Sequence, residues 1–194
     1  MTLPATPAQT PSASAAGLWK PVLIRATVAL LFGAVTIFWA SPSVHVLAWA
    51  VGLYLLATAG AVWMSRALPV AVPAVMALGG IGALVTQSDA GVALSAMLAL
   101  LVLGLLELVH GIRKRDSLAR DWLVSGVISV GTAVLLPFFT SLGAHALLGV
   151  TGGGAIISGV LWILSGLTLR HDSKAASGGT AQASAPGASP EAVN

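Results

Sequence analysis

Apolar runs of roughly membrane-spanning length alternate with short polar breaks between residues 19 and 170. There are six such runs, at about 22–40, 44–65, 69–86, 91–112, 121–139 and 144–169. A helix rises 1.5 Å per residue, so about 20 residues cross the roughly 30 Å hydrocarbon core of a bilayer. Lipid offers no hydrogen bonds to the backbone, so each amide must be satisfied within its own helix. The pattern therefore predicts an all-α, polytopic membrane protein with six transmembrane helices.

Composition supports the lipid bilayer as the main surroundings of this chain. Hydrophobic residues make up 57% of it and charged residues only 8%, about a third of the charged share of a soluble domain. The absence of cysteine excludes disulfides and thiolate metal sites. The small basic excess is distributed in a way that does not suggest nucleic acid as a partner.

Both ends of the chain differ in composition from the apolar centre. Residues 1–18 are rich in Pro, Ala, Thr and Ser and lack the basic start of a signal peptide. Residues 171–194 are mostly Ala, Gly, Ser and Pro, too poor in large apolar side chains to bury a core. We predict two disordered tails around a membrane domain at residues 19–170.

The basic residues predict the orientation. With six spans, all nine lysines and arginines fall on one face of the membrane, and the three connections on the other face contain none. The positive-inside rule then places both termini in the cytoplasm, and we predict a multi-pass protein of the bacterial inner membrane. Arg25 opens the first span, and we expect its side chain to reach back to the headgroups.

A weak internal repeat divides the membrane domain into hairpins. A shift of 99 residues pairs Gly60 with Gly159 and Trp63 with Trp162, and a shift of 51 sets "HGI" at 110–112 against "AGA" at 59–61. Two spans return the chain to its starting side, so the copies share one orientation. We predict three repeated helical hairpins, at about 19–66, 67–115 and 116–170.

The first hairpin carries a family resemblance. An arginine, a Gly-containing span, a Pro in the outer turn and a second span ending in a Gly-small-apolar step, as in "RATVALLFGAVTIFWASP" and "VGLYLLATAGAVW", resemble the HdeD-like family of bacterial acid-resistance membrane proteins. The third copy departs from this pattern at Thr132 and Ser141. The resemblance implies a six-span inner-membrane protein that supports survival at low pH, with no catalytic residue to transfer.

Small residues predict where the helices pack. Helices in lipid associate where glycine and alanine allow close backbone approach. Several glycines recur at seven-residue spacing, and a glycine-rich run at 149–159 has no strand or lysine that would suggest a nucleotide loop. We assign helix packing to Gly33, Gly60, Gly104, Gly111, Gly152, Gly159 and Gly166.

Glu107 and His110 are the first candidates for chemistry. Glu107 lies inside the fourth span and shares a face with Gly104, Gly111 and His110. One interpretation is a proton-titrating pair, since ionisable residues within spans often mark pathways. The other is structural: a protonated or hydrogen-bonded glutamate that joins the fourth span to a neighbour and pairs with the basic cluster at 113–120. A metal site would need further carboxylates, so we predict no metal and no cofactor.

The opposite face offers a second set of titratable groups. His45 and His145 open the second and sixth spans, and Asp89 lies in the middle outer turn. An imidazole has a reference pKa of about 6.5, so the two histidines would gain charge in external acid, and the three titratable groups together could sense or buffer it. Nothing in the sequence places the three close together, and separate histidines at an interface remain the alternative.

These features favour a non-enzymatic membrane protein of the HdeD-like type that acts in acid or envelope stress tolerance. Its partners would be the bilayer and either further copies of itself or other membrane proteins. The alternative is a small proton or solute transporter or channel that uses Glu107 and His110. An enzyme is disfavoured because catalysis needs several reactive groups within mutual reach.

Overall fold

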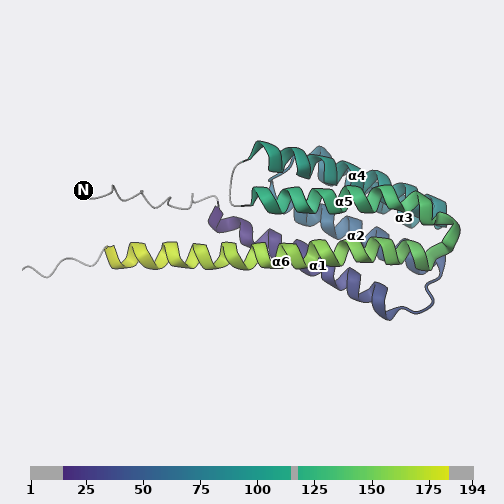
Figure 1. Ribbon diagram of the computed structural model, residues 1–194, viewed down its shortest axis with the longest axis horizontal. Coiled ribbons are helices and arrows are strands. Elements are labelled where there is room, and N and C mark those ends of the chain that lie inside the picture. The colour runs from purple at the N-terminus through teal and green to yellow at the C-terminus, as the bar shows by residue number, and fades with distance from the viewer. Residues whose placement is uncertain (1–14, 115–117, 184–194) are drawn as a thin grey trace, which may run out of the picture.

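The computed structural model describes residues 15–114 and 118–183, with side chains for 19–114 and 118–174. This part of the chain holds α-helices, one short 3₁₀-helix and no strand, so the prediction of an all-α fold is confirmed. The elements, drawn in Figure 1, are α1 (Ala15–Phe38), α2 (Val44–Ser65), α3 (Ala71–Thr86), α4 (Asp89–Arg113), α5 (Ala119–Phe139), η1 (Thr140–Leu142) and α6 (Gly143–Ala183).

Short connections turn the chain at the end of the bundle that carries no basic residues. The Ser43 hydroxyl accepts a hydrogen bond from the Val46 amide at 3.3 Å, and the Ser88 hydroxyl accepts one from Gly91 at 3.1 Å. Each serine thereby caps the start of an even-numbered helix. Gly143 begins α6 with a φ of 79°, a conformation that favours glycine.

The helices pack most extensively in pairs that cross from one predicted hairpin to the next. α2 lies along α3, α4 lies along α5, and α1 lies along α6. Figure 1 shows the last helix beside the first. The contact between α1 and α6 therefore closes the bundle.

A pair of glycines lies in each of these three contacts. A Cβ on Gly104 would be 2.8 Å from the Gly126 carbonyl oxygen, and one on Gly126 would be 2.8 Å from that of Gly104. Gly52 and Gly80 are related in the same way, at 3.0 and 2.9 Å. Between α1 and α6, a Cβ on Gly33 would be 3.5 Å from the Gly152 oxygen. The backbones approach closely because these residues lack side chains.

Six of the seven glycines assigned to packing lie against another helix, the exception being Gly60. Gly111 faces Ala119, Gly159 faces Leu30, and Gly166 faces Leu23. Gly60 is exposed, and a Cβ there would meet nothing within 4 Å, so its assignment to packing is wrong.

Geometry explains the error. Gly60 follows Gly52 by eight residues, which rotates it by about 80° around α2, away from the contact with α3. The glycines 52, 79, 80 and 126, which also pack against other helices, were not among the predicted ones.

Part of each predicted disordered tail is helical in the structure. Residues 15–18 belong to α1, and α6 continues past Arg170 to Ala183. No proline or left-handed residue interrupts α6 over that stretch, and extending an existing helix is far easier than starting one. The rest of both predicted tails, residues 1–14 and 184–194, lies outside the described residues.

The surface of the bundle is apolar and its interior holds polar groups. Phe38, Val85 and Phe138 are 86%, 75% and 73% exposed. The buried polar residues are Arg25, Thr58, Glu107, Ser125, Ser129, Thr132, Thr151, Ser158 and Ser165. The core also holds large apolar side chains such as Leu47, Leu55 and Met76, so the feature that differs from a soluble protein is the many large apolar side chains on the outside.

Four stretches are long and apolar enough to cross a bilayer: Trp19–Phe38, Val44–Ser65, Asp89–Arg113 and the continuous stretch Ala119–Lys174, which contains α5, η1 and most of α6. The shorter α3 is also apolar. With the apolar surface, these stretches support the assignment of the chain as a membrane protein.

Candidate functional site

A buried ion pair joins two helices whose backbones lie apart. The Arg25 Nη2 atom on α1 pairs with the Glu107 Oε1 atom on α4. Arg25 is 8% exposed and Glu107 is fully buried. Within the described residues, the Cα atoms of α1 and α4 nowhere approach within 8 Å. The long arginine side chain therefore bridges the centre of the bundle.

This pair corrects two expectations. Arg25 does not reach back to the headgroups, and Glu107 has Arg25 as its partner instead of the cluster at 113–120. Arg113, Lys114 and Arg120 are all exposed. Leaving either Arg25 or Glu107 unpaired inside the bundle would carry a large desolvation cost, which pairing offsets.

Trp162 of α6 supports the pair from two sides. The Arg25 guanidinium lies 4.8 Å from the centre of its ring, within range of a cation–π interaction. Its indole N–H donates a hydrogen bond to the Ser125 hydroxyl at 3.0 Å. The Ser125 hydroxyl also lies beside the Glu107 carboxylate. Four helices, α1, α4, α5 and α6, thus supply one connected set of side chains.

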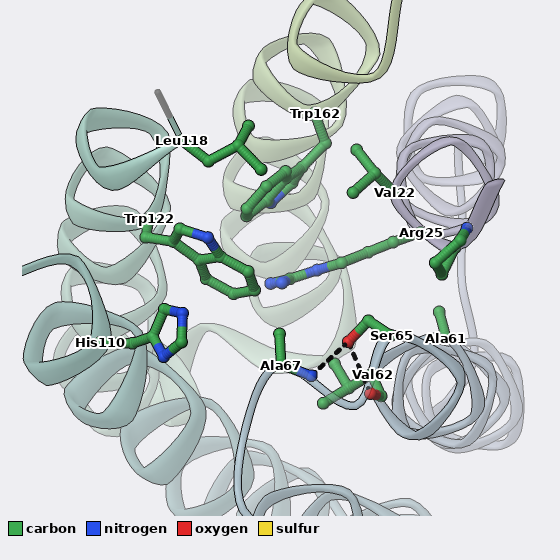
Figure 2. A pocket seen from close by; sticks show the side chains of 11 residues that line it. Val22, Arg25, Ala61, Val62, Ser65, Ala67, His110, Leu118, Trp122 and Trp162 are labelled. Carbon is green, nitrogen blue, oxygen red and sulfur yellow. Dashed lines mark hydrogen bonds between the residues drawn. The ribbon is translucent and has the colours of Figure 1, made fainter. Parts of the chain in front are cut away.

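A small cavity lies next to the ion pair, at the end of the bundle where the basic residues gather. We call it the basic-end cavity. Its volume is about 60 Å³, enough for a few water molecules. Figure 2 shows Arg25, Trp162, Trp122 and His110 converging on this space. The full lining is Pro21, Val22, Arg25, Ala61, Val62, Ser65, Ala67, His110, Leu118, Trp122 and Trp162.

Aromatic rings form one wall of the basic-end cavity. The His110 ring meets Trp122 edge-on with centroids 5.0 Å apart, and Trp122 meets Trp162 in the same way at 4.8 Å. His110 therefore lies in the wall of the cavity. Glu107 does not line the cavity, but it is paired with Arg25, which does. The two predicted residues belong to one site, with Arg25 as the connection.

The titratable residues of the opposite end remain at the surface. His45 and His145 are exposed at the starts of α2 and α6. Asp89 is half-buried at the start of α4, and its Oδ1 atom has no hydrogen-bond partner among the described residues. Within the same residues, no three or more metal-ligating side chains form a group that could hold an ion.

Sequence reasoning missed a series of buried hydroxyls beyond the ion pair. Ser129 and Thr132 of α5 and Thr151 and Ser158 of α6 line a second cavity of about 10 Å³, with Tyr54 in its wall. This space suffices for one water molecule at most. The signal for this series is the four-residue spacing of Ser125 and Ser129, which places both hydroxyls on one face of α5.

The Trp162 hydrogen bond gives a testable consequence. Trp162→Phe removes the N–H that Ser125 accepts, and a net cost of about 0.5–1.5 kcal/mol is expected. The melting temperature of the purified protein in detergent, followed by circular dichroism, should fall. Trp63→Phe is the matched control because Trp63 is 57% exposed. Equal melting temperatures for the two variants would contradict the proposed support of the pair.

Comparison with known proteins identifies one related family. Residues 72–138, about a third of the chain, match the family described as "Short repeat of unknown function (DUF308)". Comparisons with curated proteins and with solved structures give no match. The matched residues contain nearly all of α3, the whole of α4 with Glu107, and nearly all of α5. Over this region the chain is similar to a DUF308 short repeat, which fits the family resemblance seen in the sequence.

Proposed function

We propose that the chain crosses the bacterial inner membrane six times, with both termini in the cytoplasm. The alternating directions of α1–α6 bring the described basic residues to one end of the bundle (Figure 1). That end faces the cytoplasm by the positive-inside rule. The 16-residue α3 spans about 24 Å, a mismatch that a bilayer accommodates by local thinning.

Three repeated hairpins account for the arrangement. Each close glycine pair joins the second helix of one hairpin to the first helix of the next: 52 with 80, 104 with 126, and 152 with 33. The recurrence of one contact type at α2–α3, α4–α5 and α6–α1 supports an axis along the membrane normal.

Within this architecture, the proposed function is a non-enzymatic role of the HdeD-like type in acid or envelope stress tolerance. The observation that carries it is the similarity of residues 72–138 to the DUF308 short repeat, which fits the HdeD-like resemblance. The Arg25–Glu107 pair supports the non-enzymatic part, since it holds the buried carboxylate of α4 in a fixed contact at the centre of the bundle. A carboxylate bound in this way acts as a structural tie between α1 and α4. The protein would act through contacts with lipid, further copies or other membrane proteins.

The stress role is tested in cells that lack the gene. We expect lower survival after a shift to acidic medium, and recovery when the wild-type gene is returned. Arg25→Met/Glu107→Leu, which removes both charges together, tests whether the pair itself is required. Unchanged survival of the deletion strain, with the protein normally expressed in the parent, would contradict the proposed role.

A proton or solute transporter is the second candidate. The basic-end cavity reaches Arg25, and the hydroxyls of α5 and α6 continue beyond Ser125 toward the opposite end. Proteoliposomes carrying a pH-sensitive dye test this function. A transporter would dissipate an imposed proton gradient faster than empty vesicles, and Glu107→Gln would slow it. Rates equal to those of empty vesicles would exclude proton transport by this chain.

A further inference from the structure

A lateral groove runs between α1 and α2 on the outside of the bundle. We call it the α1–α2 groove. Its volume is about 590 Å³. The lining residues are Val28, Leu31, Phe32, Val35, Trp39, His45, Val46, Trp49, Ala50, Leu53, Tyr54 and Ala57. His45 and Tyr54 carry the only titratable side chains in this set, and the others are aliphatic or aromatic, with the indole N–H groups of Trp39 and Trp49 as the remaining polar groups. A ligand of this groove must therefore be largely apolar.

The length of the groove along the helices is close to the thickness of one leaflet of a bilayer. Its lining along α2 runs from His45 at the start of the helix to Ala57 near the middle of the bundle. The twelve helical rises from His45 to Ala57 correspond to about 18 Å, against about 15 Å for half of the hydrocarbon core. Trp39 and Trp49 lie toward the His45 end, the depth at which indole rings anchor proteins to headgroups.

The floor of the groove is a firm aromatic surface. The rings of Phe32 and Tyr54 stack with centroids 4.4 Å apart and planes inclined by 12°. This stack joins α1 to α2, and the groove and the basic-end cavity share no lining residue. The groove is therefore a site distinct from the basic-end cavity.

The residues around the groove favour a hydrocarbon chain over a second copy of the protein. Helices in lipid associate through small residues, yet Gly33 and Gly52 already face Ile156 and Leu84 within the same molecule. The sides of the groove carry Leu31, Val35 and Leu53, which are 64%, 41% and 54% exposed. Branched side chains of this kind suit a flexible chain that adapts to their shape, and they keep another helix backbone at a distance.

We propose that the α1–α2 groove binds one acyl chain of a phospholipid from the leaflet facing away from the cytoplasm, with its headgroup beside His45. The proposal depends on the membrane placement described above. The acyl chain fills the space between α1 and α2, and the tail accounts for most of the affinity.

Native mass spectrometry of protein taken from membranes into mild detergent tests this site. We expect one retained phospholipid per chain for the wild type and at least tenfold lower occupancy for Ala57→Phe, which fills the inner end of the groove. Gly60→Phe is the matched control, since Gly60 lies on the same helix with open space around it. Equal lipid retention by Ala57→Phe and the wild type would overturn the proposal.

Two further measurements distinguish a bound lipid from a second copy of the chain, and failure of the groove site from failure of the membrane placement. A photo-reactive residue at position 53 in an otherwise wild-type chain should cross-link to phospholipid, whereas cross-linking to a second copy would overturn the proposal. Incorporation into lipid nanodiscs tests membrane placement by itself. A chain that incorporates but retains no lipid contradicts the groove site alone, and a chain that fails to incorporate contradicts the proposed placement as well.

Discussion

Glu107→Leu is expected to destabilise the protein by about 3–5 kcal/mol, because it leaves the Arg25 guanidinium buried without its partner. Arg25→Met should cost a similar amount, since it leaves the Glu107 carboxylate fully buried and uncompensated. Both variants should lose helical circular dichroism at a lower temperature or denaturant concentration than the wild type. No Cα atoms of α1 and α4 lie within 8 Å of each other, so the pair is the ionic link between these two helices, which otherwise both pack against α2 and α6.

A variant that lacks both charges distinguishes the effect of losing the ion pair from the effect of leaving one charge unpaired. Arg25→Met/Glu107→Leu leaves no buried ion to compensate, so its stability should recover most of the loss seen in either single variant. Additive losses in the double variant would mean that the two side chains do not interact in the folded protein. The double variant also serves the survival assay, because a folded chain without the pair reports on function separately from stability.

Gly104→Val is the second change with a large expected effect. A Cβ at this position would lie 2.8 Å from both the carbonyl oxygen of Gly126 and the backbone nitrogen of Val130. Backbone atoms cannot rotate away as a side chain can, so α4 and α5 must separate. Overpacking of this kind costs about 1–3 kcal/mol, and the denaturation midpoint in detergent should shift accordingly.

Gly60→Val is the control for this substitution. It introduces the same side chain on a helix where a Cβ would meet nothing within 4 Å, so its midpoint should stay close to that of the wild type. If Gly104→Val were as stable as Gly60→Val, the close contact between α4 and α5 would be wrong.

The helices could be predicted well from the sequence because each is a long apolar run between short polar breaks. The predicted second span, 44–65, coincides with α2, and the predicted fifth span, 121–139, begins two residues after α5 does. The end of α6 was missed because composition alone does not show where an established helix stops. The prediction that six helices cross the membrane follows from the same apolar runs and awaits a topology measurement.

The site was predictable only in part. Glu107 was singled out as a buried carboxylate, but its partner comes from a residue 82 positions earlier in the chain. The signal was present, since Arg25 and Glu107 both lie within predicted spans, a few residues from the ends that share one face of the membrane. Arginines near the ends of spans tend to reach the headgroups, and this tendency predicted the wrong surroundings for Arg25. A buried carboxylate was available to pair with it instead. Packing decided between these outcomes.

Single-cysteine labelling tests the central claim, a membrane-embedded bundle whose basic end faces the cytoplasm. The chain contains no cysteine, so each introduced thiol reports on one position. Ser88→Cys lies in the connection between α3 and α4, and Lys174→Cys lies on α6 at the basic end. With a membrane-impermeant maleimide, we expect Ser88→Cys to react in intact spheroplasts and Lys174→Cys to react only after the membrane is opened. Reaction of Lys174→Cys in intact spheroplasts, or of Ser88→Cys only after opening, would contradict the account.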